Sequence, residues 1–151
     1  MYATLPVYYP SYQYANAHNE AELWRESHRV SRECRGQINR RAMEAHNSRE
    51  LDLMIDDLIR IYGIERTMCV LSRTVQFKDW DERISQAVKD RAKRFDFKAS
   101  EYEKEDATKK YILDRIDPCV IDLMYRRLMG KEAEALSLDS QQEQAACERE
   151  I

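Results

Sequence analysis

The hydrophobic positions of this chain recur mostly at the three- and four-residue spacing of helices that are buried on one face. Between residues 19 and 45, one such stripe consists of Leu23, Val30, Cys34, Ile38 and Ala45. After residue 47, a second stripe consists of Leu51, Met54, Ile55, Leu58 and Tyr62. An apolar stripe of this kind needs a neighbour to cover it. The pattern therefore predicts two long helices packed into a common core.

Two more helical segments follow the second stripe. The segment "ERTMCVLSRTVQ" is expected to bury Met68, Leu71 and Val75. It begins directly after Gly63, which occupies the position where a left-handed C′ residue would end a helix. In the segment "ERISQAVKDRAKRF", the apolar side chains lie one below another at Ile84, Val88, Ala92 and Phe95. We expect a tight hairpin or corner at Gly63 and a fourth helix beyond it.

Several residues have the spacing of helix start and stop signals. Capping boxes, in which an N-cap side chain and a glutamate three residues later exchange hydrogen bonds, are predicted for Asn19 with Glu22, Asn47 with Glu50 and Asp79 with Glu82. Asp117 and Pro118 predict the start of a fifth helix, because proline lacks only an N–H that the first turn does not use. We expect that helix to end at Met129, with Gly130 as its stop.

The stretch "TVQFKDWDERIS" places Trp80 between two aspartates. An aromatic ring among carboxylates can hold a sugar or raise the pKa of an acid. The cap spacing favours a simpler interpretation, in which Asp79 caps the next helix, Glu82 reciprocates and Trp80 is packed in the core beneath the corner. On this interpretation, replacing Trp80 by alanine costs about 3 kcal/mol or more of stability.

The remaining segments have no helical period or an ambiguous one. Residues 1–15 hold five tyrosines and no charge, which predicts an aromatic arm lying across the helices or a partner-binding arm. Residues 96–110 are predicted to be a charged loop, and residues 109–116 a short strand or the approach to a helix. Residues 131–151 are acidic and predict a frayed helix or a disordered tail. The fold class is all-α, with about five helices in one domain over residues 1–130 and room for a short strand pair.

Composition supports this fold and narrows the cellular setting. Only three glycines and three prolines occur in 151 residues, fewer than the turns of an all-β chain of this size require. No apolar run approaches the roughly 20 residues that span a bilayer, and the N-terminus lacks the basic region of a signal peptide. We expect a cytoplasmic protein that does not contact membranes.

The four cysteines are scattered along the chain at Cys34, Cys69, Cys119 and Cys147. We interpret them as reduced thiols. The alternative is a zinc site with histidine ligands from His18, His28 and His46. That site is disfavoured because no two of these ligands share one helical turn. We expect neither a metal nor a cofactor.

The charge is unevenly distributed, although the net charge is only −3. Between residues 23 and 41 there are six arginines and two glutamates, whereas residues 131–151 hold six carboxylates and two cations. On a helical wheel, one face of the first predicted helix gathers Arg25, Arg29 and Arg32, with Arg40 near its far end. This face is either an ordinary solvated surface or a binding surface for a phosphate backbone, an acidic protein or the acidic tail of this chain.

Catalytic signatures are missing from the sequence. It contains no phosphate-binding glycine loop, no nucleophile elbow and no H-E-x-x-H zinc motif. Paired carboxylates occur at Asp56-Asp57 and at Asp79 and Asp81, but nothing near them in the sequence would raise a pKa for acid-base chemistry. We therefore expect a protein that is not an enzyme.

Several longer motifs resemble a family of domains of unknown function encoded on conjugative elements and phages of Clostridia-like Firmicutes. The resemblance covers roughly the first 85 residues. It is carried by Pro6-Val7-Tyr8, Tyr14-Ala15 with His18 and Glu22, "LWRESHRVSREC", "YGIERTMCVLSRTVQ" and "KDWDERIS". Farther along, Ile116-Asp117-Pro118-Cys119 stands where the family typically has an "HPGL"-like turn, and the histidine and glycine of that turn are missing. The family has no assigned catalytic residues.

The resemblance implies a mobile-element setting, and that setting suggests a function. Mobile elements encode many small helical proteins that block host immunity by binding a nuclease complex. The expected function is therefore a non-catalytic inhibitor of a host defence system, similar to anti-CRISPR proteins and bound to a host or element protein. The alternative is a nucleic-acid-binding accessory of element transfer or regulation that uses the arginine face. A third hypothesis is a metal-dependent nuclease built on the aspartates and glutamates.

Overall fold

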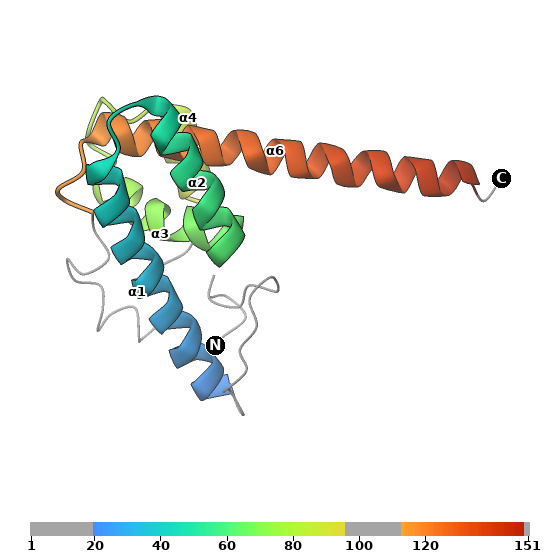
Figure 1. Ribbon diagram of the computed structural model, residues 1–151, viewed down its shortest axis with the longest axis horizontal. Helices are drawn as coiled ribbons and strands as arrows, with labels where there is room; N and C mark the ends of the chain where they lie inside the picture. The colour runs from blue at the N-terminus through green and yellow to red at the C-terminus, as the bar shows by residue number, and fades with distance from the viewer. Residues whose placement is uncertain (1–19, 96–112, 150–151) are drawn as a thin grey trace.

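The structure, a computed structural model, describes residues 20–95 and 113–149, where five helices and no strand occur. In chain order the helices are α1 (Glu20–Glu44), α2 (Ser48–Tyr62), α3 (Ile64–Phe77), α4 (Gln86–Ala92) and α6 (Pro118–Arg149) (Figure 1). The predicted all-α fold is confirmed. The predictions for residues 1–15, Asn19, His18 and the charged loop at 96–110 lie outside the described residues.

Helix α3 is the centre of the molecule. It contacts α1, α2, α4 and α6, and its middle is buried on all sides. Met68, Leu71 and Val75 are buried as predicted, but the small polar side chains of Ser72 and Thr74 are buried as well. The hydroxyl oxygen of Ser72 lies 2.7 Å from that of Tyr125 on α6, and the Thr74 hydroxyl accepts from the backbone N–H of Leu113 at 3.1 Å. These polar residues connect α3 to the last part of the chain.

The junction between α2 and α3 is a single residue, Gly63. Its φ of 84° and ψ of 154° confirm the predicted positive φ but lie outside the left-handed helical region. The Gly63 N–H bonds to the Ile59 carbonyl, and the Gly63 carbonyl accepts from Thr67. One glycine thus ends α2 and begins α3.

Helix α4 is shorter than predicted and is held at both ends by side chains from other helices. At its start, an Asp122 carboxylate oxygen on α6 accepts from the backbone N–H and the hydroxyl of Ser85, both at 2.8 Å. At its end, the Gln76 side chain on α3 donates to the carbonyls of Ala92 and Phe95. Seven helical residues are too few to be stable alone in water. Tertiary contacts therefore define this helix.

Helix α6 begins as predicted and ends much later. The Asp117 carboxylate caps it by accepting from the N–H of Cys119 at 2.8 Å, and Pro118 is its first residue. The predicted stop at Gly130 is wrong, because the helix continues through Gly130 to Arg149. Its first half is buried against α2, α3 and α4, and its second half projects beyond the other helices (Figure 1).

For residues 109–116 the sequence predicted either a short strand or the approach to a helix. The described residues 113–116 form a turn, which is neither strand nor helix. Leu113 and Ile116 are nevertheless buried in the core. Within the described residues, no helix is both long enough and apolar enough to span a membrane.

Candidate functional site

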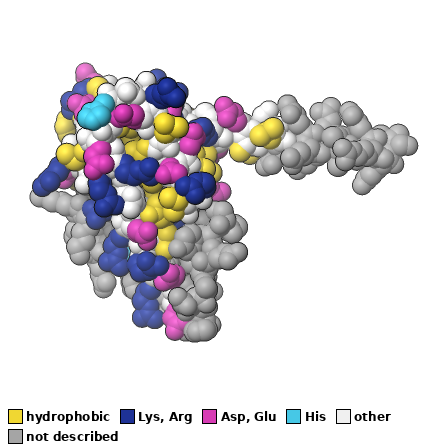
Figure 2. Space-filling model, in the orientation of Figure 1, with side chains coloured by type: hydrophobic (Ala, Val, Ile, Leu, Met, Phe, Trp, Pro, Cys, Tyr) yellow, Lys and Arg dark blue, Asp and Glu magenta, His cyan; other side chains and the backbone are white. Residues whose placement is uncertain are grey.

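The structure places the four predicted arginines of α1 together on one exposed face. All of Arg25, Arg29, Arg32 and Arg40 are exposed. Figure 2 shows basic side chains following the descending α1, with acidic side chains between them. We call this surface the arginine face.

The four arginines differ in their partners. Arg29 binds Glu26 at 2.6 Å and lies 3.6 Å from Glu33, and its hydrogen bond holds the pKa of Glu26 below its usual value. Arg25, Arg32 and Arg40 form no ion pair with the described residues. Among the described residues, no carboxylate neutralises these three guanidinium groups.

Two other residues share the arginine face. Gly36 and Met43 fall on the same side of the helical wheel as Arg25. A Cβ built on Gly36 would meet nothing within 4 Å, so the fold itself does not require glycine there. Met43 is 58% exposed. The face therefore combines positive charge with one position that has no side chain, Gly36, and one apolar side chain, Met43.

The corner between α3 and α4 differs from its prediction. Trp80 is 71% exposed, so it is not packed in the core. Asp79 and Glu82 do not cap α4, since that helix begins only at Gln86 and its cap position is Ser85. Asp81 organises the turn instead, because its carboxylate accepts from the Arg83 backbone N–H and binds the Arg83 guanidinium at 2.7 Å. Hydrogen bonding from Arg83 lowers the pKa of Asp81 to about 2.

The corner presents an aromatic pair to solvent. Phe77, one turn before Trp80, is 55% exposed. The backbone that carries them is anchored, because Ile84 is buried and Lys78 lies 3.8 Å from Asp114. Large aromatic side chains, tryptophan above all, are enriched among the residues that contribute most to protein-protein binding. Sequence reasoning missed this pair because cap spacing does not reveal which side of a turn meets the core.

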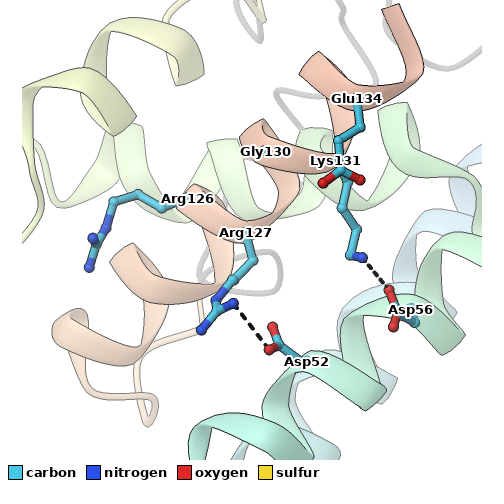
Figure 3. Close-up of a pocket in the computed structure, with 7 residues that line it drawn as sticks. All are labelled: Asp52, Asp56, Arg126, Arg127, Gly130, Lys131 and Glu134. Carbon is cyan, nitrogen blue, oxygen red and sulfur yellow. Dashed lines mark ion pairs between the residues drawn. The ribbon is translucent and has the colours of Figure 1, made fainter. Parts of the chain in front are cut away.

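A pocket of about 270 Å³ lies between α2 and α6 (Figure 3). Two ion pairs cross it, from Arg127 to Asp52 at 3.1 Å and from Lys131 to Asp56 at 2.6 Å. The bond to Asp56 raises the pKa of Lys131. Three cations and three carboxylates line the pocket together with Gly130: Asp52, Asp56, Arg126, Arg127, Lys131 and Glu134. Because the charges balance, we interpret the pocket as a structural contact in which ion pairs attach α6 to α2.

The adjacent carboxylates Asp56 and Asp57 form ion pairs with different helices. Asp56 binds Lys131, whereas Asp57 binds Arg41 of α1 at 2.8 Å and also Arg60. Hydrogen bonds from these arginines, that of Arg60 first, lower the pKa of Asp57. A lowered pKa is the opposite of what a general acid at neutral pH requires.

A buried guanidinium lies between α1 and α3. Arg66 has no exposed surface, and its Nη1 donates to the Ser27 carbonyl at 2.6 Å and to the Ser31 hydroxyl at 2.8 Å. Nearby, burial raises the pKa of Cys34 to about 12, which keeps its thiol protonated and unreactive at neutral pH. The sequence supports no prediction for Arg66, because a single arginine in a helical pattern does not indicate burial by itself.

The structure describes the side chains of three cysteines and two histidines. Cys34 and Cys69 are buried and Cys119 is exposed, all three as free thiols. His28 is buried, whereas His46 is exposed. Over residues 20–95 and 113–149, no three or more histidine, cysteine or acidic side chains gather as metal ligands would.

Comparison with known proteins identifies the family and nothing more specific. No curated protein matches the chain, and no solved structure matches it. A family model described as "Protein of unknown function (DUF3849)" matches residues 7–133, a longer span than the 85 residues of the resemblance. That span includes α1 to α4 and the buried half of α6. The chain therefore belongs to the DUF3849 family of proteins of unknown function.

Proposed function

We propose that this protein acts in the cytoplasm by binding another macromolecule without catalysis, and that the arginine face of α1 contacts the partner. The observation that carries the proposal is the set of three exposed guanidinium groups, those of Arg25, Arg32 and Arg40, without an ion pair among the described residues. They lie along one side of a 25-residue helix. A row of such groups suits an acidic protein surface or a phosphate backbone.

The carboxylates support a binding role over a catalytic one. Asp57, Asp81 and Asp122 each hold two helices or a turn together, as described above. Their hydrogen-bonding capacity is used by arginine, serine and backbone donors. These groups act as structural anchors.

The mobile-element setting that the resemblance implies suggests the class of partner. We propose a host defence effector, such as a CRISPR-associated nuclease complex, which carries both acidic surfaces and bound nucleic acid. The protein would inhibit it by occupying a surface that the effector needs.

Plasmid transformation of bacteria with active CRISPR interference tests this proposal. Wild-type protein should restore transformation, and a variant with Arg25→Glu, Arg32→Glu and Arg40→Glu should not. The matched control reverses three exposed cations elsewhere, Arg49→Glu, Lys93→Glu and Arg115→Glu, and should behave as wild type. If the wild-type protein neither bound a defence complex nor restored transformation, the proposal would be abandoned.

The alternative function is a nucleic-acid-binding accessory of element transfer, favoured by the same three guanidinium groups. Fluorescence anisotropy with labelled DNA and RNA distinguishes it from the first proposal. Direct binding should weaken steeply with salt, with a log-log slope of about −0.7 to −0.9 per phosphate contact, and the α1 triple variant should flatten that slope. Binding that ignored salt, or no binding to either nucleic acid, would exclude this alternative.

A further inference from the structure

The second half of α6 has no neighbour in the chain as described. From residue 133 to residue 138, six successive side chains are exposed, which is more than one full turn. Leu136 is 63% exposed and Leu138 is 58% exposed. The two leucines point about 200° apart on the wheel, so no single side of this segment is apolar.

A projecting helix of this composition needs a surface to pack on. Helical segments of this length are marginal in water on their own, and most helix stability in proteins comes from packing. A helix that is polar all round and unsupported is not expected to be stable. The structure nevertheless continues α6 as one helix to Arg149 (Figure 1).

The charge of this segment matches the arginine face. Glu132 already binds Arg91 at 2.6 Å, which leaves five carboxylates against Arg149 over residues 133–151. On the arginine face, Arg25, Arg32 and Arg40 form no ion pair with the described residues. The lengths also match. Arg25 to Arg40 spans roughly 22 Å of helix, and residues 133–149 span roughly 24 Å, at the usual rise per residue.

The same chain cannot make this contact with itself. Helix α6 runs without a break from Pro118 to Arg149, and its projecting end leads away from α1 (Figure 1). Folding back would require the helix to break. Among the described residues, the arginine face on α1 of a second molecule offers a helix surface of matching length and opposite charge.

From these observations we infer that two copies of this chain associate reciprocally, with the acidic end of α6 of each copy lying along the arginine face of the other. Gly36 carries no side chain, which lets the α6 backbone approach closely, and Met43 offers an apolar contact to the exposed leucines. Its regulatory consequence rests on the proposed function, because the dimer covers the face that the partner uses. Association with a partner and self-association therefore compete.

Analytical ultracentrifugation of the purified full chain tests the inference without any partner. The 18.0 kDa protein should shift toward twice that mass as concentration rises through the micromolar range, and high salt should reverse the shift. The α1 triple variant and an α6 variant, Asp139→Lys with Glu143→Lys and Glu148→Lys, should each remain monomeric alone. Mixed together they should associate, since each supplies the charge that the other has lost.

Two controls separate charge from other causes. The Arg49→Glu, Lys93→Glu, Arg115→Glu variant should dimerise as wild type does. Gly36→Leu, which keeps every charge and places a bulky side chain on the arginine face, should raise the dissociation constant at least tenfold while circular dichroism shows an intact fold.

Some outcomes would overturn the inference. The inference would be contradicted by a wild-type chain that stays monomeric at every concentration. Charge reversals that leave dimerisation unchanged would contradict it too. Failure of the two mixed variants to associate would do so as well. The proposed function fails separately, because it depends on restored transformation. If the inference holds, the α6 variant should bind its partner at least as tightly as wild type.

Discussion

Asp81 is the residue that shapes the corner between α3 and α4. Its side chain is almost entirely buried, yet it carries a charge that Arg83 neutralises through backbone and side-chain hydrogen bonds. The turn therefore depends on the ionised carboxylate. Its pKa is lowered from an ordinary value of 3.8 to about 2, first by the side-chain hydrogen bond from Arg83.

That shift predicts a pH dependence of stability. Because the folded-state pKa is depressed, the contribution of Asp81 is fully present above about pH 4 and is lost as the pH falls toward about 2. Thermal unfolding should show wild type more stable than Asp81→Asn near neutral pH, with the difference shrinking below about pH 4. The control is Asp79→Asn, on the same turn. A wild-type advantage over Asp81→Asn that persisted unchanged to pH 2 would contradict this account.

Trp80 sets a second prediction at this scale. Since the side chain is 71% exposed, Trp80→Ala should change the free energy of unfolding by no more than about 0.5 kcal/mol. Ile84→Ala, at a buried position four residues away, should cost about 2 to 5 kcal/mol. Urea denaturation measures both. A large loss of stability in Trp80→Ala would contradict this prediction and would indicate that the ring is packed in the core.

At the scale of elements, two glycines inside similar apolar patterns have opposite roles. Gly63 has a φ of 84° and separates two helices, whereas Gly130 lies within α6 with nothing near its Cβ position. Glycine inside a helix is a weak helix former, but it stops a helix only where the chain must turn. At residue 130 the ion pairs of Arg127 and Lys131 with α2 hold the next turn in place.

Alanine substitutions should separate the two glycines. Gly130→Ala should raise the free energy of unfolding by about 0.5 to 1 kcal/mol, because alanine favours the helix and has room for its methyl group. Gly63→Ala should lower it by more than about 1 kcal/mol, because a positive φ strains any side chain. Denaturation midpoints give both values, and a destabilised Gly130→Ala would mean that α6 does break there.

Helix α4 shows how one element can depend on another. Its start is capped by Asp122, which belongs to α6 and is 6% exposed. Asp122→Ala should cost about 1 to 3 kcal/mol and raise hydrogen exchange over residues 85–92. Arg126→Ala removes only the guanidinium on the outer side of Asp122, at 57% exposure, and should cost about 1 kcal/mol or less. Equal effects of the two changes would contradict the capping role.

At the scale of the whole molecule, a helical body carries a projecting helix end of opposite charge to its arginine face. If self-association stabilises that end, helical content per residue should rise with protein concentration. Far-UV circular dichroism at several concentrations measures this directly. The α6 charge-reversal variant should show no such rise, and a concentration-independent signal in wild type would argue against packing of the projecting segment.

Much of the fold was predictable because period and caps are local. The five buried residues of α2, the Asn47 cap and the Asp117-Pro118 start all follow from spacing and are confirmed. The second half of the Asn47 box differs slightly, since Glu50 accepts from the N–H of His46, one residue before the cap. The corner at Trp80 and the course of α6 were not predictable, because both depend on which neighbour lies on the outer side.

The sequence by itself determined that the described part of the chain is helical, where most of its helices begin and which residues of α2 are buried. It also placed four arginines on one face of α1. Only the tertiary structure decided that α3 lies at the centre, that Asp81 and not Asp79 builds the corner, and that α6 runs past Gly130. The physical reason is range: hydrogen bonds within a turn are encoded by neighbours in sequence, whereas burial and ion pairing depend on helices that meet only after folding.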